Sequence, residues 1–364
     1  MRRDVPDEIL NRRFGPYVLL RELGCGGMAQ VYLCALPCSP KVARFFALKC
    51  IHGAYNGIPE YVRLFYHEAE IALRLHHANI VETWSCGVIE GRHTLAMDYL
   101  CGQPVSALIA RGHLSLEIAL WIAVQALDGL EYLHEKCDIL GTPLGIVHRD
   151  LTPDNIYVGY DGTVKIFDFG VSKCGGDADE IQNGMMVGKY AYMSPEQCRG
   201  EAVDARSDLF SLAAVLYEMC MGYGAFHRDS DIATIDAVVQ GKVVAPNAQS
   251  WRFPSFLSQV IMRGLASDKS RRYESARWFA DDLRMFVKMQ GWTNLKQKCQ
   301  DHMKNVFAQE IDGEFEFMKK SMHCLREFMP KIEELETKGA REPQNLSGSE
   351  WGTGTGSVTF SKLV

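Results

Sequence analysis

Two short polar motifs, separated by a short interval, constrain this chain more than any other feature of its sequence. The first is HRDLTPDN at residues 148–155, and the second is DFG, which begins at Asp168, thirteen residues after the first motif ends. Residues 156–158 and 164–166 between them contain β-branched side chains and flank Asp161-Gly162. Asp-Gly between two such runs predicts a β-hairpin, which would bring both motifs to one cleft.

The side chains of these motifs match the needs of phosphoryl transfer. That reaction needs a carboxylate that orients the attacking hydroxyl and accepts its proton, together with hard oxygen ligands that hold Mg²⁺ against the phosphates. Asp150 suits the first role, and Asn155 and Asp168 suit the second. A chance occurrence of this set of residues at this spacing is very improbable, so we expect the cleft to be a catalytic site.

A glycine-rich stretch upstream suits the same chemistry. Gly24-Cys25-Gly26-Gly27 lies between two strand-like runs, where glycines allow backbone N–H groups to approach a polyphosphate. A dinucleotide-binding loop requires a helix after its glycines, so a strand on both sides favours a flap over a nucleotide. A plain hairpin turn is the alternative.

Lys49 ends the third strand-like run, and burial of its ammonium group requires an anionic partner. Glu68, on the helix that we expect to follow, is the natural partner. A lysine held by a carboxylate can present a fixed positive charge to phosphate oxygens. An ordinary surface ion pair is the alternative, and the downstream motifs are what favour the catalytic interpretation.

The hydrophobic pattern divides the chain into two lobes. Strand-like runs predict a three-stranded antiparallel meander, then a helix from Pro59 and two further strands; the runs are 17–23, 30–36, 44–50, 81–87 and 93–99. From Ser115, a good N-cap, the pattern becomes helical, with helices predicted at 115–136, 203–219, 231–240, 256–265 and 276–289. We therefore expect an α+β fold, with a small lobe of antiparallel sheet and one helix at 17–100 and a larger, mainly helical lobe at 101–290.

Helical spacing continues beyond Gly291 as far as Pro330, which we expect to end the helix; the apolar positions are Leu295, Cys299, Val306, Ile311, Met318, Met322, Leu325 and Met329. The later spacing resembles a heptad seam, but it covers fewer than three heptads. We expect this helical extension, 291–337, to pack against the larger lobe. We also expect residues 1–16 to form an N-terminal extension and residues 338–364 to form a flexible tail.

Composition and charge exclude several classes of function. Lys and Arg total 39 against 45 for Asp and Glu, a net charge of −6 that argues against binding of a nucleic acid backbone. No apolar run approaches the ~20 residues of a membrane span, and the N-terminus has no secretory signal, so we expect a cytoplasmic protein. The 12 cysteines are scattered with no Cys-x-x-Cys pair, which favours reduced thiols over zinc sites or disulfides.

The motifs together resemble those of the protein kinase superfamily, and the resemblance runs in the right order from about Tyr17 to Met289. It extends to SPE at 194–196, to Asp208 in ARSDLFSLAAVLYEM, and to Arg272 in SDKSRRY, which in the family pairs with the glutamate of SPE. The stretches DILGTPLGIVHRDLTPDN and GKYAYMSPEQ are most similar to bacterial, eukaryotic-like serine/threonine kinases of the myxobacterial type.

The resemblance implies a bilobal protein kinase that transfers the γ-phosphoryl group of ATP, with Mg²⁺, to Ser or Thr hydroxyl groups of proteins, itself included. It implies Asp150 as the base, a Lys49–Glu68 pair as the phosphate anchor, and Asn155 and Asp168 as metal ligands. It also implies a nucleotide pocket lined by Leu23, Gly24, Gly26, Gly27, Val31, Ala47, Lys49, Met97, Asp98, Leu100 and Tyr157. No nucleic acid partner and no membrane span are expected.

The chain departs from the family at two positions that face each other in the family fold. Thr152 stands where the family usually has Lys, and Lys189 stands where it usually has Thr. We hypothesise that the cation has changed places, so that Lys189 reaches the γ-phosphate or Asp150 while Thr152 supplies the lost hydroxyl. The alternative is that Lys189 points to solvent and Thr152 is a tolerated loss. Ala29 replaces the last glycine of the flap, which predicts a stiffer loop that still binds ATP.

The resemblance also bears on regulation and on two alternative functions. Residues 173–193 contain no Ser or Thr, so we expect activity without phosphorylation of that segment. An ATP-binding pseudokinase scaffold would explain the changes at residues 152 and 189. It would not explain why five catalytic side chains of the family are all present, namely Lys49, Glu68, Asp150, Asn155 and Asp168. A small-molecule kinase of related fold is disfavoured, because SPE and Arg272 build a platform for protein substrates in the family.

Overall fold

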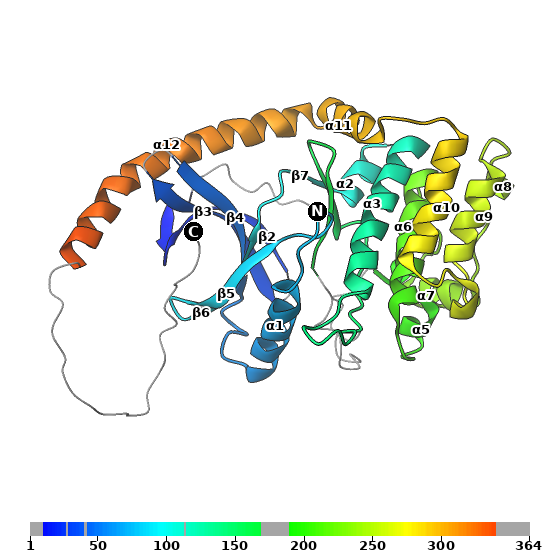
Figure 1. The fold of residues 1–364 in the computed structure, drawn as a ribbon, viewed down its shortest axis with the longest axis horizontal. Coiled ribbons are helices and arrows are strands. Elements are labelled where there is room, and N and C mark those ends of the chain that lie inside the picture. Colours follow the sequence, from blue (N-terminus) through cyan, green and yellow to red (C-terminus); the bar gives the residue numbers. More distant parts are fainter. Residues whose placement is uncertain (1–9, 27, 40–41, 113, 169–188, 340–364) are drawn as a thin grey trace.

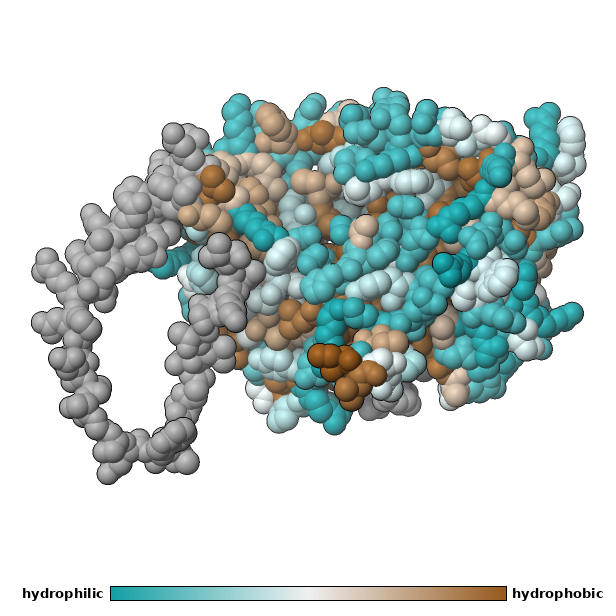
Figure 2. All heavy atoms as spheres, in the orientation of Figure 1, coloured by the Kyte–Doolittle hydropathy of each residue, from teal (hydrophilic) through white to brown (hydrophobic). Residues whose placement is uncertain are grey.

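The structure, a computed structural model, describes residues 10–26, 28–39, 42–112, 114–168 and 189–339, with side chains described as far as residue 325. The described chain forms one lobe built on an antiparallel sheet and one built mainly from helices, and helix α12 (Ala308–Gly339) runs from the edge of the larger lobe across the small lobe (Figure 1). This is the bilobal α+β arrangement that the sequence predicts. In Figure 2 the visible surface is mainly hydrophilic, with hydrophobic side chains in separate patches, as is usual for a globular protein.

The described residues of the small lobe form a six-stranded antiparallel sheet with strand order β1-β2-β3-β4-β6-β5. The elements are β1 (Arg12–Phe14), β2 (Tyr17–Cys25), β3 (Ala29–Ser39), β4 (Val42–Ile51), α1 (Pro59–Ala72), β5 (Thr83–Ile89) and β6 (Arg92–Asp98). The predicted strands and helix are confirmed. Strand β1 lies within residues 1–16, which we expected to be an extension, because three residues are too few to show a periodic pattern.

Helix α1 begins with a proline in its first turn and packs one face against the sheet. Its buried residues recur at helical spacing: Phe65, Glu68, Ala69 and Ala72. Two of them, Phe65 and Ala69, share an apolar cluster with Ile51 of β4 and Leu95 of β6. Glu68 therefore lies on the face of α1 that meets the strand carrying Lys49.

The larger lobe combines a small sheet, of order β7-β8-β9, with a set of helices. Its described elements are β7 (Gly102–Pro104), α2 (Val105–Ala110), α3 (Leu116–His134), β8 (Ile156–Gly159), β9 (Val164–Ile166), η2 (Lys189–Tyr192), α5 (Pro195–Cys198), α6 (Ala205–Met221), α7 (Asp231–Gln240), α8 (Pro246–Gln249), α9 (Ser255–Gly264), η3 (Lys269–Arg271), α10 (Ala276–Met289) and α11 (Leu295–Val306). The predicted helices and the β8–β9 hairpin are confirmed. Ser115 caps α3 as expected, because its hydroxyl accepts a hydrogen bond from the Ile118 backbone N–H.

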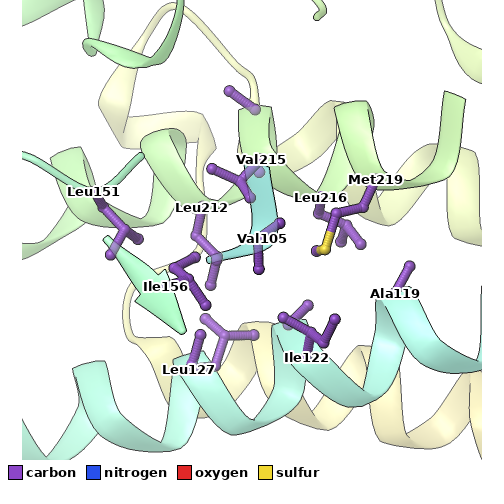
Figure 3. Close-up of a cluster of buried hydrophobic side chains, with 14 of the residues drawn as sticks. Val105, Ala119, Ile122, Leu127, Leu151, Ile156, Leu212, Val215, Leu216 and Met219 are labelled. Atoms are coloured by element: carbon purple, nitrogen blue, oxygen red, sulfur yellow. The ribbon is translucent and has the colours of Figure 1, made fainter. Parts of the chain in front are cut away.

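The core of the larger lobe anchors the HRDLTPDN motif. Figure 3 shows side chains of α3 and α6 facing one another, among them Ile122 and Leu212. Leu151, inside the motif, and Ile156, directly after it, belong to the same cluster and are 1% and 0% exposed. Because both side chains are fixed by packing, the polar residues between them are presented from a rigid base.

A buried ion pair joins α5 to the segment before α10. Arg272 donates to both carboxylate oxygens of Glu196, at 2.7 and 2.8 Å, and both side chains are buried. Ser207 donates a further hydrogen bond to the same carboxylate at 2.6 Å. Burial alone would raise the pKa of Glu196, but these hydrogen bonds hold it below its usual range. The pairing of Glu196 with Arg272 that the resemblance implies is therefore present.

The C-terminal extension differs from our expectation at Pro330. Helix α12 does not end there but continues to Gly339. A proline inside a helix removes one backbone hydrogen bond, and a long helix can absorb that loss as a local bend.

No helix among the described residues is both long enough and apolar enough to cross a bilayer.

The packing of the extension agrees with our expectation for α11 but not for α12. Helix α11 does pack on the larger lobe, where Cys299 is buried in the main core. Helix α12 instead covers the small lobe. The outer face of the sheet at β2 and β3 is apolar, and its burial under the helix is favourable. Phe317 and Leu325 of α12 are buried against that face in a cluster with Val18, Leu20, Leu33 and Ala35.

Replacing Arg272 with Ala would leave the Glu196 carboxylate buried without its partner. We expect the free energy of unfolding to fall by about 3–5 kcal/mol, as is usual when one member of a buried ion pair is removed. Chemical denaturation of the full chain measures this change. Arg277→Ala, at an exposed position of α10, is the matched control and should change stability by less than about 0.5 kcal/mol. Equal stability of the two variants would contradict a structural role for the pair.

Candidate active site

A single ammonium group joins the two lobes at the cleft. Lys49 Nζ lies 2.7 Å from Glu68 Oε1 and 2.8 Å from Asp168 Oδ1. Burial alone would lower the pKa of Lys49, but the two carboxylates raise it above its usual range. The charge of Lys49 in turn lowers the pKa of Asp168 to about 2. Lys49 and Asp168 are therefore both charged at neutral pH.

Strand register brings most of the predicted nucleotide-lining residues onto neighbouring strands. Val31 of β3 lies opposite Lys49 of β4. Ala47 of β4 lies opposite Met97 of β6, and Asp98 is the last residue of β6. Leu100 follows in the segment that links the lobes. Val31, Ala47, Lys49 and Met97 therefore share one face of the sheet, because paired residues and residues two apart point the same way. The Asp98 carboxylate instead accepts a hydrogen bond from Trp84.

Tyr157 approaches from the larger lobe. It lies on β8, and its hydroxyl donates a hydrogen bond to the Gly102 carbonyl at 2.7 Å. Its ring meets the Phe167 ring edge to face, with centroids 6.0 Å apart. Phe167 directly precedes Asp168, so Tyr157 packs beside the predicted metal ligand.

The described part of the flap forms a hydrogen bond within itself and leaves the space beside its first glycine, Gly24, open. Leu23 and Gly24 lie close to the end of β2, which is at Cys25, and the Gly26 N–H donates to the Ala29 carbonyl at 2.8 Å. A Cβ built on Gly24 would meet no other atom within 4 Å. The protein's own packing therefore does not require glycine at this position, and contact of Gly24 with a nucleotide stays a prediction. Gly27, also predicted to contact the nucleotide, lies outside the described residues.

Asp150 is held by its own motif. The Asn155 side-chain N–H group donates to the Asp150 carbonyl at 2.7 Å and to its carboxylate at 3.3 Å. Both side chains are buried, at 7% and 6% exposure. The Phe167 N–H donates to the Asn155 carbonyl at 3.2 Å, which ties the motif to the residue before Asp168. The predicted base and the two predicted metal ligands are therefore brought together.

A buried carboxylate behind the motif fixes its backbone. Asp208 of α6 is fully buried and accepts the His148 N–H at 2.8 Å and the Arg149 N–H at 2.9 Å. His134, at the end of α3, donates to the same carboxylate at 2.7 Å. Burial alone would raise the pKa of Asp208, but these hydrogen bonds and the nearby histidines lower it. The turn that presents Asp150 is therefore bonded to the core rather than to solvent.

Two residues of this region have a backbone conformation that side chains rarely adopt. Arg149 has φ of +66° and Asp168 has φ of +60°. Such strain persists only where surrounding contacts over-determine the structure, and it concentrates at functional sites. The hydrogen bond from Arg149 to Asp208 and the ion pair of Asp168 with Lys49 supply those contacts.

Of the two residues that depart from the family, Lys189 contacts the carboxylate of Asp150 and Thr152 does not. Lys189 Nζ is 2.9 Å from Asp150 Oδ2, and the lysine side chain is 36% exposed. Burial alone would lower the pKa of Lys189, but Asp150 and Asp168 raise it. The Thr152 hydroxyl is buried and has no hydrogen-bond partner among the described residues. Lys189 thus contacts the predicted base, whereas Thr152 forms no bond that would replace the lost hydroxyl.

The donor set suits a metal that takes most of its ligands from phosphates and water. Among the described residues, no group of three or more His, Cys, Asp or Glu side chains could hold a metal ion. Mg²⁺ usually binds through one or two carboxylates together with substrate phosphates, and it keeps several waters. Asn155 and Asp168 fit that pattern. The fit depends on bound nucleotide, since the two residues alone would not form a cage.

Sequence reasoning missed two residues that support the site. Gln197 of α5 donates to the Arg149 carbonyl at 2.8 Å, and it was detectable as the fourth residue of a capping box that starts at Ser194. His134 carried no sequence signal, because its partner Asp208 lies 74 residues away. The rest of DFG and the segment without Ser or Thr, as far as residue 188, lie outside the described residues.

The comparisons with known proteins agree with this geometry. The profile of the Protein kinase domain matches residues 17–323. The chain therefore belongs to the protein kinase family. It is similar to the tyrosine-protein kinase MasK of Myxococcus xanthus, with 36% identity over 279 residues, which is 75% of this chain and 43% of MasK. It is also similar to the serine/threonine-protein kinase PrkC of Bacillus subtilis, with 31% identity across 74% of this chain and 40% of PrkC.

The chain spans about two fifths of the length of these curated relatives. Among solved structures, the PknI kinase domain of Mycobacterium tuberculosis matches with a TM-score of 0.57 and 27% identity. The match covers 78% of this chain and 98% of that domain. It confirms the protein kinase fold.

Replacing Asp208 with Asn would leave at least one buried backbone N–H of the motif without an acceptor. We expect the free energy of unfolding to fall by about 2–3 kcal/mol at pH 7. Because the pKa of Asp208 is lowered in the folded protein, its contribution is present above the unfolded pKa of about 3.9 and is lost as the pH falls through the folded value. The difference from wild type should therefore narrow below about pH 3.9.

Denaturation at several pH values, with the exposed Asp229→Asn as the matched control, tests this expectation. A difference between Asp208→Asn and wild type that stays constant down to pH values below the folded pKa would rule out the ionised carboxylate as the source of stability.

Proposed function

We propose that this protein is a serine/threonine protein kinase that transfers the γ-phosphoryl group of ATP to hydroxyl groups of protein substrates, with Mg²⁺ as the metal. The observation that carries the proposal is the position of Lys49 Nζ, 2.7 Å from Glu68 and 2.8 Å from Asp168. One cation thereby joins the small lobe to the predicted metal ligand of the larger lobe. Phosphates, a fixed cation and a metal must meet at one such point for phosphoryl transfer.

Positioning and charge stabilisation account for the chemistry. Lys49, held between two carboxylates, would bind phosphate oxygens, and the glycine-rich flap would cover the phosphates. Asp150 would orient the substrate hydroxyl and accept its proton, with its carboxylate held in place by Asn155. Mg²⁺, held by Asn155 and Asp168, would supply neutralisation of the charge that develops on the phosphoryl group.

Lys189 belongs to the proposed machinery as a second cation. Its ammonium group contacts the Asp150 carboxylate, and its pKa is raised in part by Asp168. A cation at the Asp150 carboxylate would stand close to the transferring phosphoryl group, because the substrate hydroxyl is activated at that carboxylate. Thr152, which stands where the family usually has Lys, is uncharged and cannot supply that charge. This geometry favours relocation of the cation over a solvent-facing Lys189.

The acceptor residue is proposed from likeness. PrkC is named a serine/threonine-protein kinase, whereas MasK is named a tyrosine-protein kinase. Phosphoamino acid analysis of the labelled product separates the two. Phosphotyrosine alone in the product would contradict Ser and Thr as the acceptors, and would leave phosphoryl transfer itself intact.

A pseudokinase scaffold is the second candidate, and the changes at residues 152 and 189 are the observation that favours it. The pseudokinase is the weaker candidate. Lys49 Nζ contacts both Glu68 and Asp168, at 2.7 and 2.8 Å, and binding of ATP without transfer would not require both contacts. Binding of ATP with no transfer to protein would establish the pseudokinase. Transfer to a small molecule but to no protein would establish a small-molecule kinase.

Radiolabel transfer from ATP to a generic basic protein, and to the kinase itself, tests the proposed activity. We expect Asp150→Asn to lower the rate by about 10²–10⁴-fold, because it removes the group that accepts the hydroxyl proton. Asp312→Asn, at an exposed position of α12, is the control and should match wild type. Equal transfer by Asp150→Asn and wild type would exclude Asp150 as the base.

A charge-relocation test addresses Lys189. We expect Lys189→Met to lower the rate of transfer by roughly 10²-fold, the usual effect of removing one group that stabilises transition-state charge. The double variant Lys189→Thr with Thr152→Lys restores the family's arrangement and should recover most of the rate. Lys298→Met on α11, which removes a surface ion pair with Glu117 of α3, is the matched control. Normal turnover of Lys189→Met would show that the cation has not moved.

A further inference from the structure

A carboxylate outside the family motifs contacts both segments that lead to the nucleotide pocket. Glu314 of α12 accepts a hydrogen bond from the Tyr99 hydroxyl at 2.8 Å and forms an ion pair with Arg21. Arg21 also donates to the Tyr99 hydroxyl at 2.9 Å. The three side chains therefore form a closed triangle, in which the Glu314 and Arg21 side chains are only 15% and 21% exposed.

Each partner of Glu314 is next to residues that the proposed function assigns to ATP. Arg21 lies on β2, two residues before Leu23 and the flap. Tyr99 lies between Asp98 and Leu100, in the segment whose backbone is proposed to bind the adenine. The triangle thus ties the strand that carries the flap to the link between the lobes.

Helix α12 is anchored on both sides of Glu314, so the carboxylate has little freedom to move. One turn earlier, Glu310 forms an ion pair with Arg111 at the end of α2 in the larger lobe. One turn later, Phe317 is buried against the small lobe, and the Arg21 guanidinium lies 4.3 Å from the centre of its ring. These positions share one face of the helix, because residues three and four apart are neighbours on its surface. Figure 1 shows α12 beginning beside the larger lobe and running across the small lobe.

Electrostatics favour this arrangement over a loose surface contact. Burial, together with the neighbouring carboxylate of Glu314, raises the pKa of Tyr99, so its hydroxyl stays protonated and donates. Burial alone would lower the pKa of Arg21, but Tyr99 and Glu314 raise it. Charge-assisted hydrogen bonds in a half-buried site are the strong ones, and loss of one partner leaves the others poorly solvated.

We propose that Glu314 is a positioning residue for nucleotide binding, which acts through Arg21 and Tyr99 to set the flap strand and the interlobe link in the geometry that receives ATP. The inference rests on the proposed function for the existence of the ATP site. It adds that α12 is part of that site's support, and that the C-terminal helix and the nucleotide are coupled.

The test compares Glu314→Ala with Glu316→Ala in the full chain. Glu316 lies on the same helix, is exposed, and forms an ion pair with Lys319 of that helix at 3.6 Å, so it is the matched control. Titration calorimetry measures the Kd for a non-hydrolysable ATP analogue, and steady-state kinetics measure KM for ATP and kcat. We expect Glu314→Ala to raise Kd and KM roughly tenfold with kcat changed less than about threefold, and Glu316→Ala to match wild type.

Two further variants keep the inference testable if Glu314→Ala unfolds. Glu314→Gln retains an acceptor for Tyr99 without the charge, so its Kd should fall between those of wild type and Glu314→Ala. Tyr99→Phe keeps the ring but removes the hydroxyl, and we expect it to raise the Kd as well. In a double-mutant cycle with Glu314→Gln the two effects should combine to less than their product, because both act on one network.

The outcomes are separable from those of the proposed function. A wild-type chain that neither binds ATP nor transfers phosphate would overturn the proposed function. A wild-type chain that does both, with the same ATP affinity in Glu314→Ala and Glu316→Ala, would overturn only the role of Glu314. A fall in kcat at constant Kd and KM would also contradict it, because the proposed effect is on nucleotide binding.

Discussion

A lysine ammonium group held between two carboxylates is the interaction on which the cleft depends. The Lys49 side chain is 12% exposed, and it bridges Glu68 of the small lobe and Asp168 from beyond the β8–β9 hairpin of the larger lobe. Loss of either carboxylate would leave a charge poorly compensated, which is costly in a partly buried site. The approach of the two lobes and the formation of these ion pairs therefore require each other.

The remaining parts of the site are fixed from behind by the core. Leu151 and Ile156 pack into the main hydrophobic cluster, and Asp208 holds the backbone N–H groups of residues 148 and 149. These contacts sustain the left-handed conformation at Arg149 and leave Asp150 directed at the cleft. Rigid support of this kind is what positioning requires, because small displacements of catalytic groups cost large factors in rate.

The sequence predicts the strands and the main helices, because periodicity is a local signal. Motif spacing also predicts that Lys49 and Glu68 lie together and that Asp150 lies beside Asn155, as the structure has them. The sequence does not predict β1, which is too short, or the partner of His134, which is remote in sequence. The placement of α12 was wrong for a related reason. The apolar positions of that helix indicate that it packs, but the surface that accepts it is the outer face of β2 and β3, which exists only once the sheet has formed.

The central claim is that Lys49, Glu68 and Asp168 converge on one metal-bound nucleotide, and the Mg²⁺ dependence of ATP affinity tests it most directly. Calorimetric titrations of the wild type and of Asp168→Asn with a non-hydrolysable ATP analogue, at increasing Mg²⁺ concentrations, measure that dependence. The account predicts that Mg²⁺ strengthens binding to the wild type and has a much smaller effect on Asp168→Asn. The same Mg²⁺ dependence in both proteins would contradict it.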